Sequence, residues 1–180
     1  MTLRGRVALV TGVSRANGIG AAIARRLHDD GAVVAATGWP PHDDEMPWGA
    51  TELGDLPFPV GRHDLDDPRA PAALVDEVAG RHGRLDVVVA VHARSSDVSF
   101  ADVTAEELDR CWATNVRSIV LLAQHLATVH DPVANGTDLI DRLEGCRISL
   151  GEQLHEPFQP ASVVGDRLGV FHVMAAGALF

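Results

Sequence analysis

The stretch from Arg6 to Gly31 constrains the fold more than any other part of the chain. It begins with RVALVT, a short apolar and β-branched run that is typical of a buried strand. A loop with three glycines follows, and a helix is then predicted up to Gly31 from the spacing of its apolar residues, Ile19, Ala22, Ile23 and Leu27. A second apolar run at residues 32–37 completes a strand–helix–strand unit.

The rest of the chain continues this alternation. Further strands are expected at residues 60–64, 85–91 and 147–150, and further helices at residues 68–82, 104–130 and 161–177. A capping box, Thr104 to Glu107, begins the second of these helices. We therefore predict one α/β domain over residues 1–180, a Rossmann-type doubly wound parallel sheet with strand order 3-2-1-4-5. Its ligand crevice is expected at the carboxyl ends of strands 1 and 4.

Residues 38–59 interrupt the alternation with five prolines and the acidic run Asp43-Asp44-Glu45. Loops of this length in compact domains are usually functional or mobile. We expect an irregular excursion here, and we interpret the acidic run as a solvated turn rather than a metal site.

The three glycines of the first loop are spaced for binding a nucleotide. Glycine permits positive φ angles and lets the backbone approach a phosphate, while the start of the helix adds unpaired N–H groups. The candidate cofactor-binding residues of this loop are Gly12, Ser14, Arg15, Gly18, Ile19 and Gly20. The alternative is that these glycines only allow tight packing of the helix on the sheet.

Two features favour NADP(H) over NAD(H). Arg15 is placed to reach an additional phosphate, and the second strand ends in Thr37-Gly38-Trp39 without an acidic residue for a ribose 2′-hydroxyl.

Composition excludes several classes of partner and site. The net charge of −10 disfavours nucleic acid, and no apolar run is long enough to span a membrane. The N-terminus lacks a secretory signal pattern, so a cytoplasmic location is expected. No histidine spacing typical of a metal site occurs. The sequence contains no tyrosine, and all fifteen basic residues are arginine, so it offers neither a phenol nor an ε-amine.

Several motifs together resemble the short-chain dehydrogenase/reductase family. The loop TG-VSRAN-GIG is similar to that family's TGxxxGIG, with two additional residues. Asp64-Leu65 resembles the pair that contacts adenine, and residues 85–89 resemble the strand before an Asn-Asn-Ala-Gly motif. Asn115 matches the asparagine that helps to organise a catalytic water. The resemblance implies the fold predicted above and binding of a nicotinamide dinucleotide.

The chain departs from this family where catalysis is expected. The Asn-Asn-Ala-Gly position, which supports the cofactor, reads Ala90-Val91-His92-Ala93. Alignment places Ser149 or Gly151 at the catalytic serine, Val163 at the tyrosine and Arg167 at the lysine. Because the chain has no tyrosine or lysine, no register supplies the Tyr-x-x-x-Lys pair.

The resemblance has two further implications for architecture. Family members continue into further strands and helices, so we interpret this chain as C-terminally truncated relative to the family fold. Helices 104–130 and 161–177 correspond to a dimer interface in the family, and we expect a homodimer or larger assembly through them. The alternative is that their apolar faces pack only on the chain's own sheet.

Three functions remain open from the sequence. His92 and His155 border the predicted crevice. Together with Asn115 and Ser95 or Ser96, they form a candidate centre for non-redox acid–base chemistry on a small carbonyl compound. The alternative is that His92 is a hydrogen-bonded loop residue and His155 is solvated. The second possible function is that of a pseudoenzyme, which binds a nucleotide or a homologous active subunit and acts by assembly with it. The third is that of an NADPH-dependent reductase with an atypical proton donor.

Overall fold

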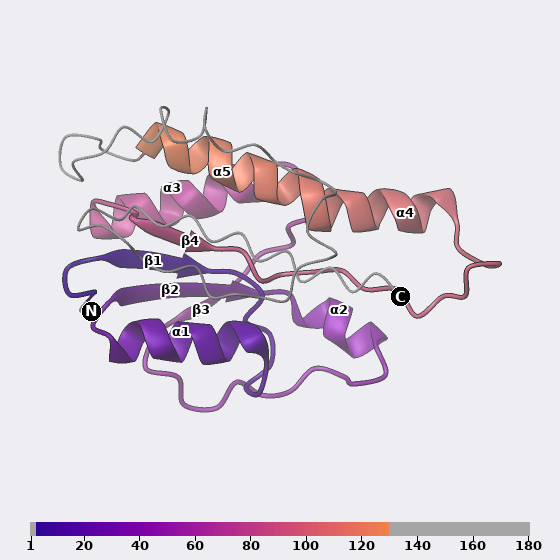
Figure 1. The fold of residues 1–180 in the computed structure, drawn as a ribbon, viewed down its shortest axis with the longest axis horizontal. Coiled ribbons are helices and arrows are strands. Elements are labelled where there is room, and N and C mark those ends of the chain that lie inside the picture. Colours follow the sequence, from indigo (N-terminus) through magenta and orange to yellow (C-terminus); the bar gives the residue numbers. More distant parts are fainter. Residues whose placement is uncertain (1–2, 130–180) are drawn as a thin grey trace, which may run out of the picture.

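The computed structural model describes residues 3–129, which form a parallel sheet of order β3-β2-β1-β4 between two layers of helices (Figure 1). The strands are β1 (Val7–Val10), β2 (Val33–Gly38), β3 (Val60–Arg62) and β4 (Val87–Val89). The helices are α1 (Ile19–Asp29), α2 (Pro40–Glu45), α3 (Ala70–His82), α4 (Ala105–Trp112), the π-helical turn η1 (Ala113–Arg117) and α5 (Ser118–Val129). The predicted fold class and the order of the first four strands are confirmed. The expected fifth strand and the helix 161–177 lie outside the described residues.

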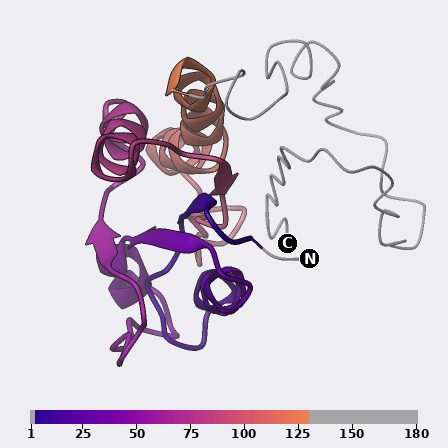
Figure 2. The same ribbon diagram turned by 90° about the vertical axis from the view of Figure 1, so that its left-hand side faces the viewer.

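Both faces of the sheet are buried. Along β1, Val7 and Leu9 pack in a cluster with α3 and α5, whereas Ala8 and Val10 pack in a second cluster with α1. Figure 2 shows α1 on one face and α3 and α5 on the other. A strand covered on both sides reads as a continuous apolar run, which is why β1 was predictable from sequence.

The face that α1 buries agrees with the predicted one only in part, because Ile23 and Leu27 pack against the cluster on that side of the sheet but Ile19 and Ala22 do not. Its buried residues are Gly20, Ala21 and Ala24, whereas Ile19 is 63 % exposed and Ala22 is exposed. A Cβ atom on Gly20 would lie 2.4 Å from the carbonyl oxygen of Gly12, so only very small residues fit where the helix meets the sheet. Close packing of α1 therefore selects its smallest residues.

The excursion at residues 38–59 is more ordered than predicted. It contains α2, and Phe58 is buried in the cluster on the α1 face of the sheet. Asp43, in α2, is only 7 % exposed, so the prediction of a solvated acidic turn is wrong for this residue. Two side chains of the glycine loop, Ser14 and Arg15, and Trp48 of this region surround its carboxylate, and the contacts with the loop cannot be read from the local sequence.

The predicted long helix is interrupted at its centre. Thr104 Oγ1 accepts a hydrogen bond from the backbone N–H of Glu107 at 3.2 Å, which confirms the predicted N-cap. The π-helical turn then separates α4 from α5, and such turns often occur at functional sites. Leu122 of α5 is buried in the core, whereas Leu108 and Trp112 of α4 are exposed. The dimer contact expected through this helix stays a prediction. Among residues 3–129, no helix combines the length and hydropathy that a membrane span requires.

Candidate functional site

A cleft of about 240 Å³ lies at the carboxyl ends of β1, β2 and β4, the right-hand end of the sheet in Figure 1. All six predicted glycine-loop residues line it: Gly12, Ser14, Arg15, Gly18, Ile19 and Gly20. Asp64 and Leu65 line it as well. Ala90 does not, because its side chain is buried at 3 % exposure and the backbone enters the cleft only at Val91. The cleft thus unites most of the predicted cofactor residues.

The glycines bring three backbone segments together at the cleft floor. Gly12 has a φ of +73°, and a Cβ there would lie 2.5 Å from the backbone nitrogen of His92. A Cβ on Gly38 would lie 2.3 Å from the carbonyl oxygen of Val13. The two alternatives for the glycine loop are therefore compatible, since close packing is what shapes the cleft.

The N-terminus of α1 opens into this cleft. Its N-cap, Gly18, has an extended backbone, and no side chain of the described residues caps the first turn. The N–H groups of that turn are the groups that commonly bind phosphate in proteins. The loop and helix therefore suit the pyrophosphate of a dinucleotide.

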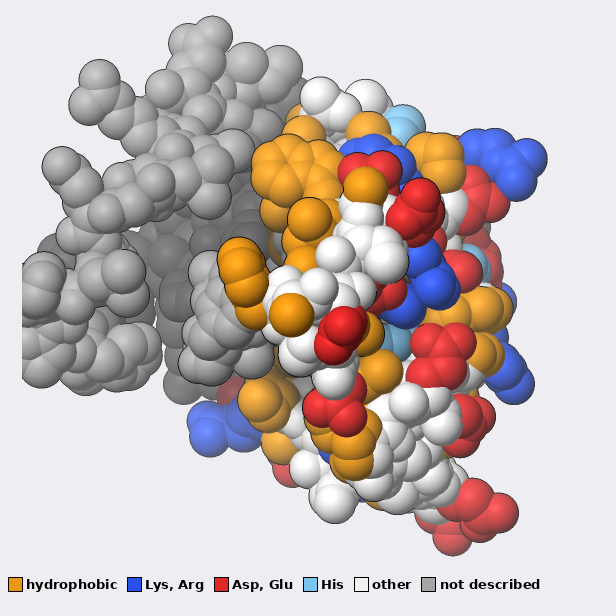
Figure 3. Space-filling model, turned by 90° about the vertical axis from the view of Figure 1, so that its right-hand side faces the viewer, with side chains coloured by type: hydrophobic (Ala, Val, Ile, Leu, Met, Phe, Trp, Pro, Cys, Tyr) orange, Lys and Arg blue, Asp and Glu red, His pale blue; other side chains and the backbone are white. Residues whose placement is uncertain are grey.

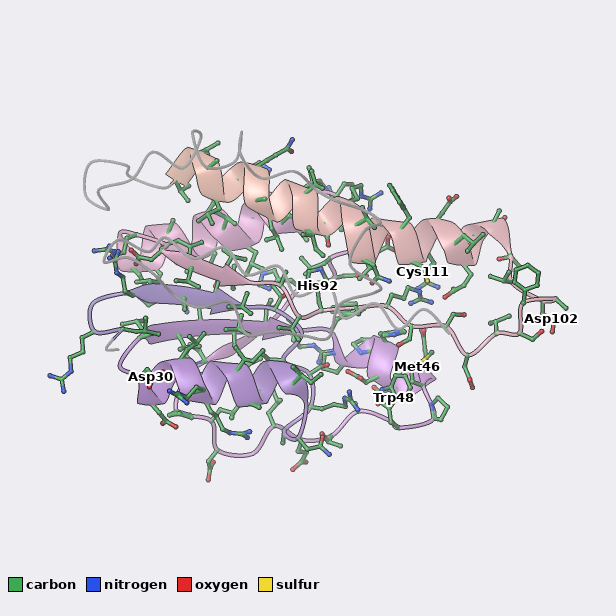
Figure 4. The ribbon with its side chains drawn as sticks, viewed as in Figure 1. Asp30, Met46, Trp48, His92, Asp102 and Cys111 are labelled. Carbon is green, nitrogen blue, oxygen red and sulfur yellow. The ribbon has the colours of Figure 1, made fainter. Side chains whose placement is uncertain are left out.

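One half of the cleft, the β2 side, is built around Asp43 and consists of Ser14, Arg15, Asp43 and Trp48. Ser14 Oγ donates to Asp43 Oδ2, and Trp48 Nε1 donates to Asp43 Oδ1 at 2.9 Å. Arg15 Nε lies 3.3 Å from the same carboxylate oxygen, and its guanidinium lies 5.5 Å from the Trp48 ring centroid. Figure 4 shows Trp48 beside α2, away from His92. The sequence did not indicate Asp43 as a site residue.

The other half, the β4 side, consists of His92, Arg94, Glu107 and Asn115. His92 lies between the sheet and the long helix (Figure 4), and both of its ring nitrogens are engaged. Nε2 lies 3.1 Å from the carbonyl oxygen of Thr114, which can only accept, so Nε2 carries the proton. Nδ1 then accepts from the hydroxyl of Thr11 at 2.6 Å. The ring thereby joins β1 to the helix.

Burial lowers the pKa of His92 to about 4, so the ring is neutral at physiological pH. A neutral ring with both nitrogens occupied by protein groups is poorly placed to exchange protons with a ligand. The geometry therefore favours the alternative in which His92 is a hydrogen-bonded structural residue.

The side-chain amide of Asn115 is also fully hydrogen-bonded to protein groups. Its Oδ1 accepts from the backbone N–H of Arg94 at 2.7 Å, and its Nδ2 donates to the Arg94 carbonyl at 2.9 Å. Both bonds fix the segment that follows β4. Asn115 therefore holds the cleft wall in place, whereas its neighbour Thr114 lines the cleft itself.

Arg94 connects this segment to α4 and α2. Its side chain is 9 % exposed and donates to both carboxylate oxygens of Glu107, at 3.2 and 3.1 Å. Burial acts to raise the pKa of Glu107, but the hydrogen bonds and charge of Arg94 hold it below its usual value. His42 of α2 accepts from the backbone N–H of Ser95 at 3.2 Å, and burial and then the charge of Arg94 lower the pKa of its ring. Consecutive residues of α2 thus contact both sides of the cleft.

The remaining predicted site residues lie outside the described part of the chain: Ser149, His155 and Arg167. Among residues 3–129, no group of three His, Cys, Asp or Glu side chains is arranged to hold a metal ion.

Comparison with known proteins assigns the family. A family model described as enoyl-(acyl carrier protein) reductase matches residues 12–137. The chain belongs to the short-chain dehydrogenase/reductase family. It is 36 % identical over 130 residues to 1-cyclohexenylcarbonyl-CoA reductase of Streptomyces collinus, covering 71 % of this chain and 45 % of the relative. It is 37 % identical over 129 residues to versicolorin reductase 1 of Aspergillus parasiticus, covering 68 % of this chain and 46 % of the relative.

A solved structure supports the same assignment. A short-chain dehydrogenase from Burkholderia cenocepacia, determined in complex with NADP, aligns with a TM-score of 0.58 and 35 % identity. The alignment covers 72 % of this chain and 53 % of that one. The chain spans about half the length of the curated relatives it matches.

Proposed function

We propose that the cleft binds a nicotinamide dinucleotide and that the protein takes part in NAD(P)H-dependent reduction of a carbonyl compound. The observation that carries the proposal is the N-terminus of α1, which no side chain of residues 3–129 caps and which Gly12 and Gly20 hold in a cleft that Asp64 and Leu65 also line. The relatives described above are named reductases, and the Burkholderia neighbour was determined with NADP, which supports this proposal over the non-redox one.

Each part of the cleft has a role in this proposal. The first turn of α1 holds the pyrophosphate through backbone N–H groups, and Gly12 and Gly20 allow the backbone to come close. Bound there, the dinucleotide would supply a hydride to the substrate. Asn115 and Arg94 fix the wall after β4, which keeps that side of the cleft rigid.

The proton that completes a reduction needs a source other than the family's tyrosine, which the 180 residues lack. His92 is a poor donor because its ring is neutral and both nitrogens are engaged. We propose water or an atypical residue outside residues 3–129 as the donor, for which His155 is the sequence-based candidate. The same occupancy of His92 and Asn115 argues against their use in non-redox acid–base chemistry.

Gly18 offers a test of binding that preserves the fold. Its extended backbone suits an aspartate or serine N-cap, and the Cβ would lie 3.2 Å from the carbonyl oxygen of Arg15, which is tight but tolerable. We expect Gly18→Asp to leave the stability of the protein unchanged or higher and to weaken dinucleotide affinity at least about tenfold. A carboxylate would then occupy the position of a phosphate.

Gly18→Ser is the matched control, since it adds an N-cap without charge. NADH and NADPH titrations followed by nicotinamide fluorescence, with urea denaturation in parallel, measure both effects. Equal affinity in wild type and Gly18→Asp would contradict the assignment of the phosphate site. Failure of the wild type to bind either dinucleotide at millimolar concentration would remove the proposed function.

A further inference from the structure

The carboxylate of Asp43 contacts the two side chains of the glycine loop that could otherwise bind an anion, Ser14 and Arg15. Ser14 donates its hydroxyl to it, and Arg15 places its guanidinium beside it. The Asp43 side chain is 10 % exposed, so this carboxylate is part of the cleft wall rather than a mobile surface group. Trp48 fixes it further through its indole N–H and stacks against Arg15.

This arrangement changes what the loop can bind. In a dinucleotide fold, the loop after the first strand and the end of the second strand surround the adenosine ribose. An arginine there accommodates a 2′-phosphate, whereas a carboxylate accepts hydrogen bonds from free ribose hydroxyls. Here the arginine is already paired with a carboxylate, and the serine hydroxyl is already donated.

The other described arginines that line the cleft also lie beside carboxylates. Arg94 pairs with Glu107, and Arg110 lies 3.7 Å from Asp66. Each arginine that lines the cleft in the described part of the chain therefore lies beside a carboxylate. Figure 3, which views this end of the molecule, shows acidic and basic side chains interspersed rather than a continuous basic patch. Among the lining residues that the structure describes, a phosphate dianion at the ribose would meet no arginine without a neighbouring carboxylate and would face Asp43.

We infer that Asp43 is a specificity-determining residue and that it makes the cleft select NAD(H) over NADP(H). This inference rests on the proposed function, since it concerns which dinucleotide that site accepts. It replaces the preference for NADP(H) that Arg15 alone suggests, because the charge of Arg15 is neutralised by a residue 28 positions later in the chain.

Asp43→Asn separates charge from shape. Asparagine keeps an oxygen that accepts from Trp48 or Ser14 but removes the negative charge and frees the charge of Arg15. The wild type is expected to bind NADH more tightly than NADPH, and Asp43→Asn to shift the affinity ratio toward NADPH at least about tenfold. Asp44→Asn is the matched control, because it removes the same charge from an exposed neighbour in the same helix. Its affinity ratio should equal that of the wild type.

The measurement is a titration of each protein with NADH and NADPH, with urea denaturation to verify folding. Tighter binding of NADPH by the wild type, or an unchanged ratio in a folded Asp43→Asn variant, would overturn the inference and leave the proposed function intact. Weaker NADPH binding in Asp43→Asn would also overturn it, since Asp43 would then position Arg15 for the phosphate. Binding of neither dinucleotide by the wild type would reject the proposed function itself. If Asp43→Asn does not fold, Asp43→Ser makes the same change of charge.

Discussion

The two sides of the cleft both pair an arginine with a carboxylate, but they leave different groups for a ligand. On the β2 side, the pair Arg15–Asp43 lies next to the N-terminus of α1, which lines the cleft and which no side chain in the described part of the chain caps. On the β4 side, Arg94, Asn115 and His92 use their hydrogen-bonding groups on the protein itself. The difference indicates that the β2 side retains binding capacity, whereas the polar side chains of the β4 side hold the wall together.

Gly12 joins the two sides, and changing it should have the largest effect. Gly12→Ala combines an unfavourable positive φ with a Cβ 2.5 Å from the backbone of His92, so we expect at least about 3 kcal/mol loss of unfolding free energy. Gly5→Ala is the control, because Gly5 has a similar φ of +77° but no atom within 4 Å of the added Cβ. It should cost about 1 kcal/mol in urea denaturation. Equal losses of unfolding free energy in the two variants would show that the close contact between Gly12 and the backbone of His92 does not affect stability.

His92 should give the β4 side a pH-dependent stability. Its pKa is lowered from 6.5 to about 4 by burial, so the unfolded chain takes up a proton more readily than the folded protein. The contribution of the neutral His92 ring to the unfolding free energy is therefore fully present at pH values above the pKa of the unfolded chain. It declines as the pH falls through 6.5 toward about 4. A shift of this size corresponds to about 3 kcal/mol.

His92→Gln removes this titration while keeping a polar side chain. The difference in unfolding free energy between wild type and variant should shrink by about 2–3 kcal/mol between about pH 7.5 and pH 4.5. Carboxylates titrate in both proteins and cancel in this difference. A difference that stays constant with pH would mean that His92 is not a buried neutral ring.

Removing the amide of Asn115, on the same side of the cleft, should lower the unfolding free energy by a smaller amount. Asn115→Ala removes two hydrogen bonds to the backbone of Arg94, which predicts a loss of about 2 kcal/mol in urea denaturation. The exposed Asn17 gives the control, and Asn17→Ala should change stability by less than about 0.5 kcal/mol. If Asn115→Ala keeps full stability, the amide does not anchor the segment after β4.

Local sequence was sufficient for most of the fold but for only part of the cleft. The runs RVALVT and LDVVVAV predicted β1 and β4 because buried parallel strands need apolar residues at every position. Thr104 and Glu107 predicted a helix start because a cap depends on residues three positions apart. The sequence placed Asp43 in solvent, since its partner Ser14 is 29 positions away and Arg15 is 28 positions away.

The sequence by itself determined the order of the four described strands, the positions of α1 and α3, the glycine loop and the absence of tyrosine and lysine. These properties depend on residue type and on spacing over a few positions. Only the tertiary structure decided that the neutral His92 ring bonds the end of β1 to the helix that follows α4, and that Asp43 neutralises the charge of Arg15. Burial and charge pairing are set by segments that the fold brings together, and those contacts determine what each side chain can do.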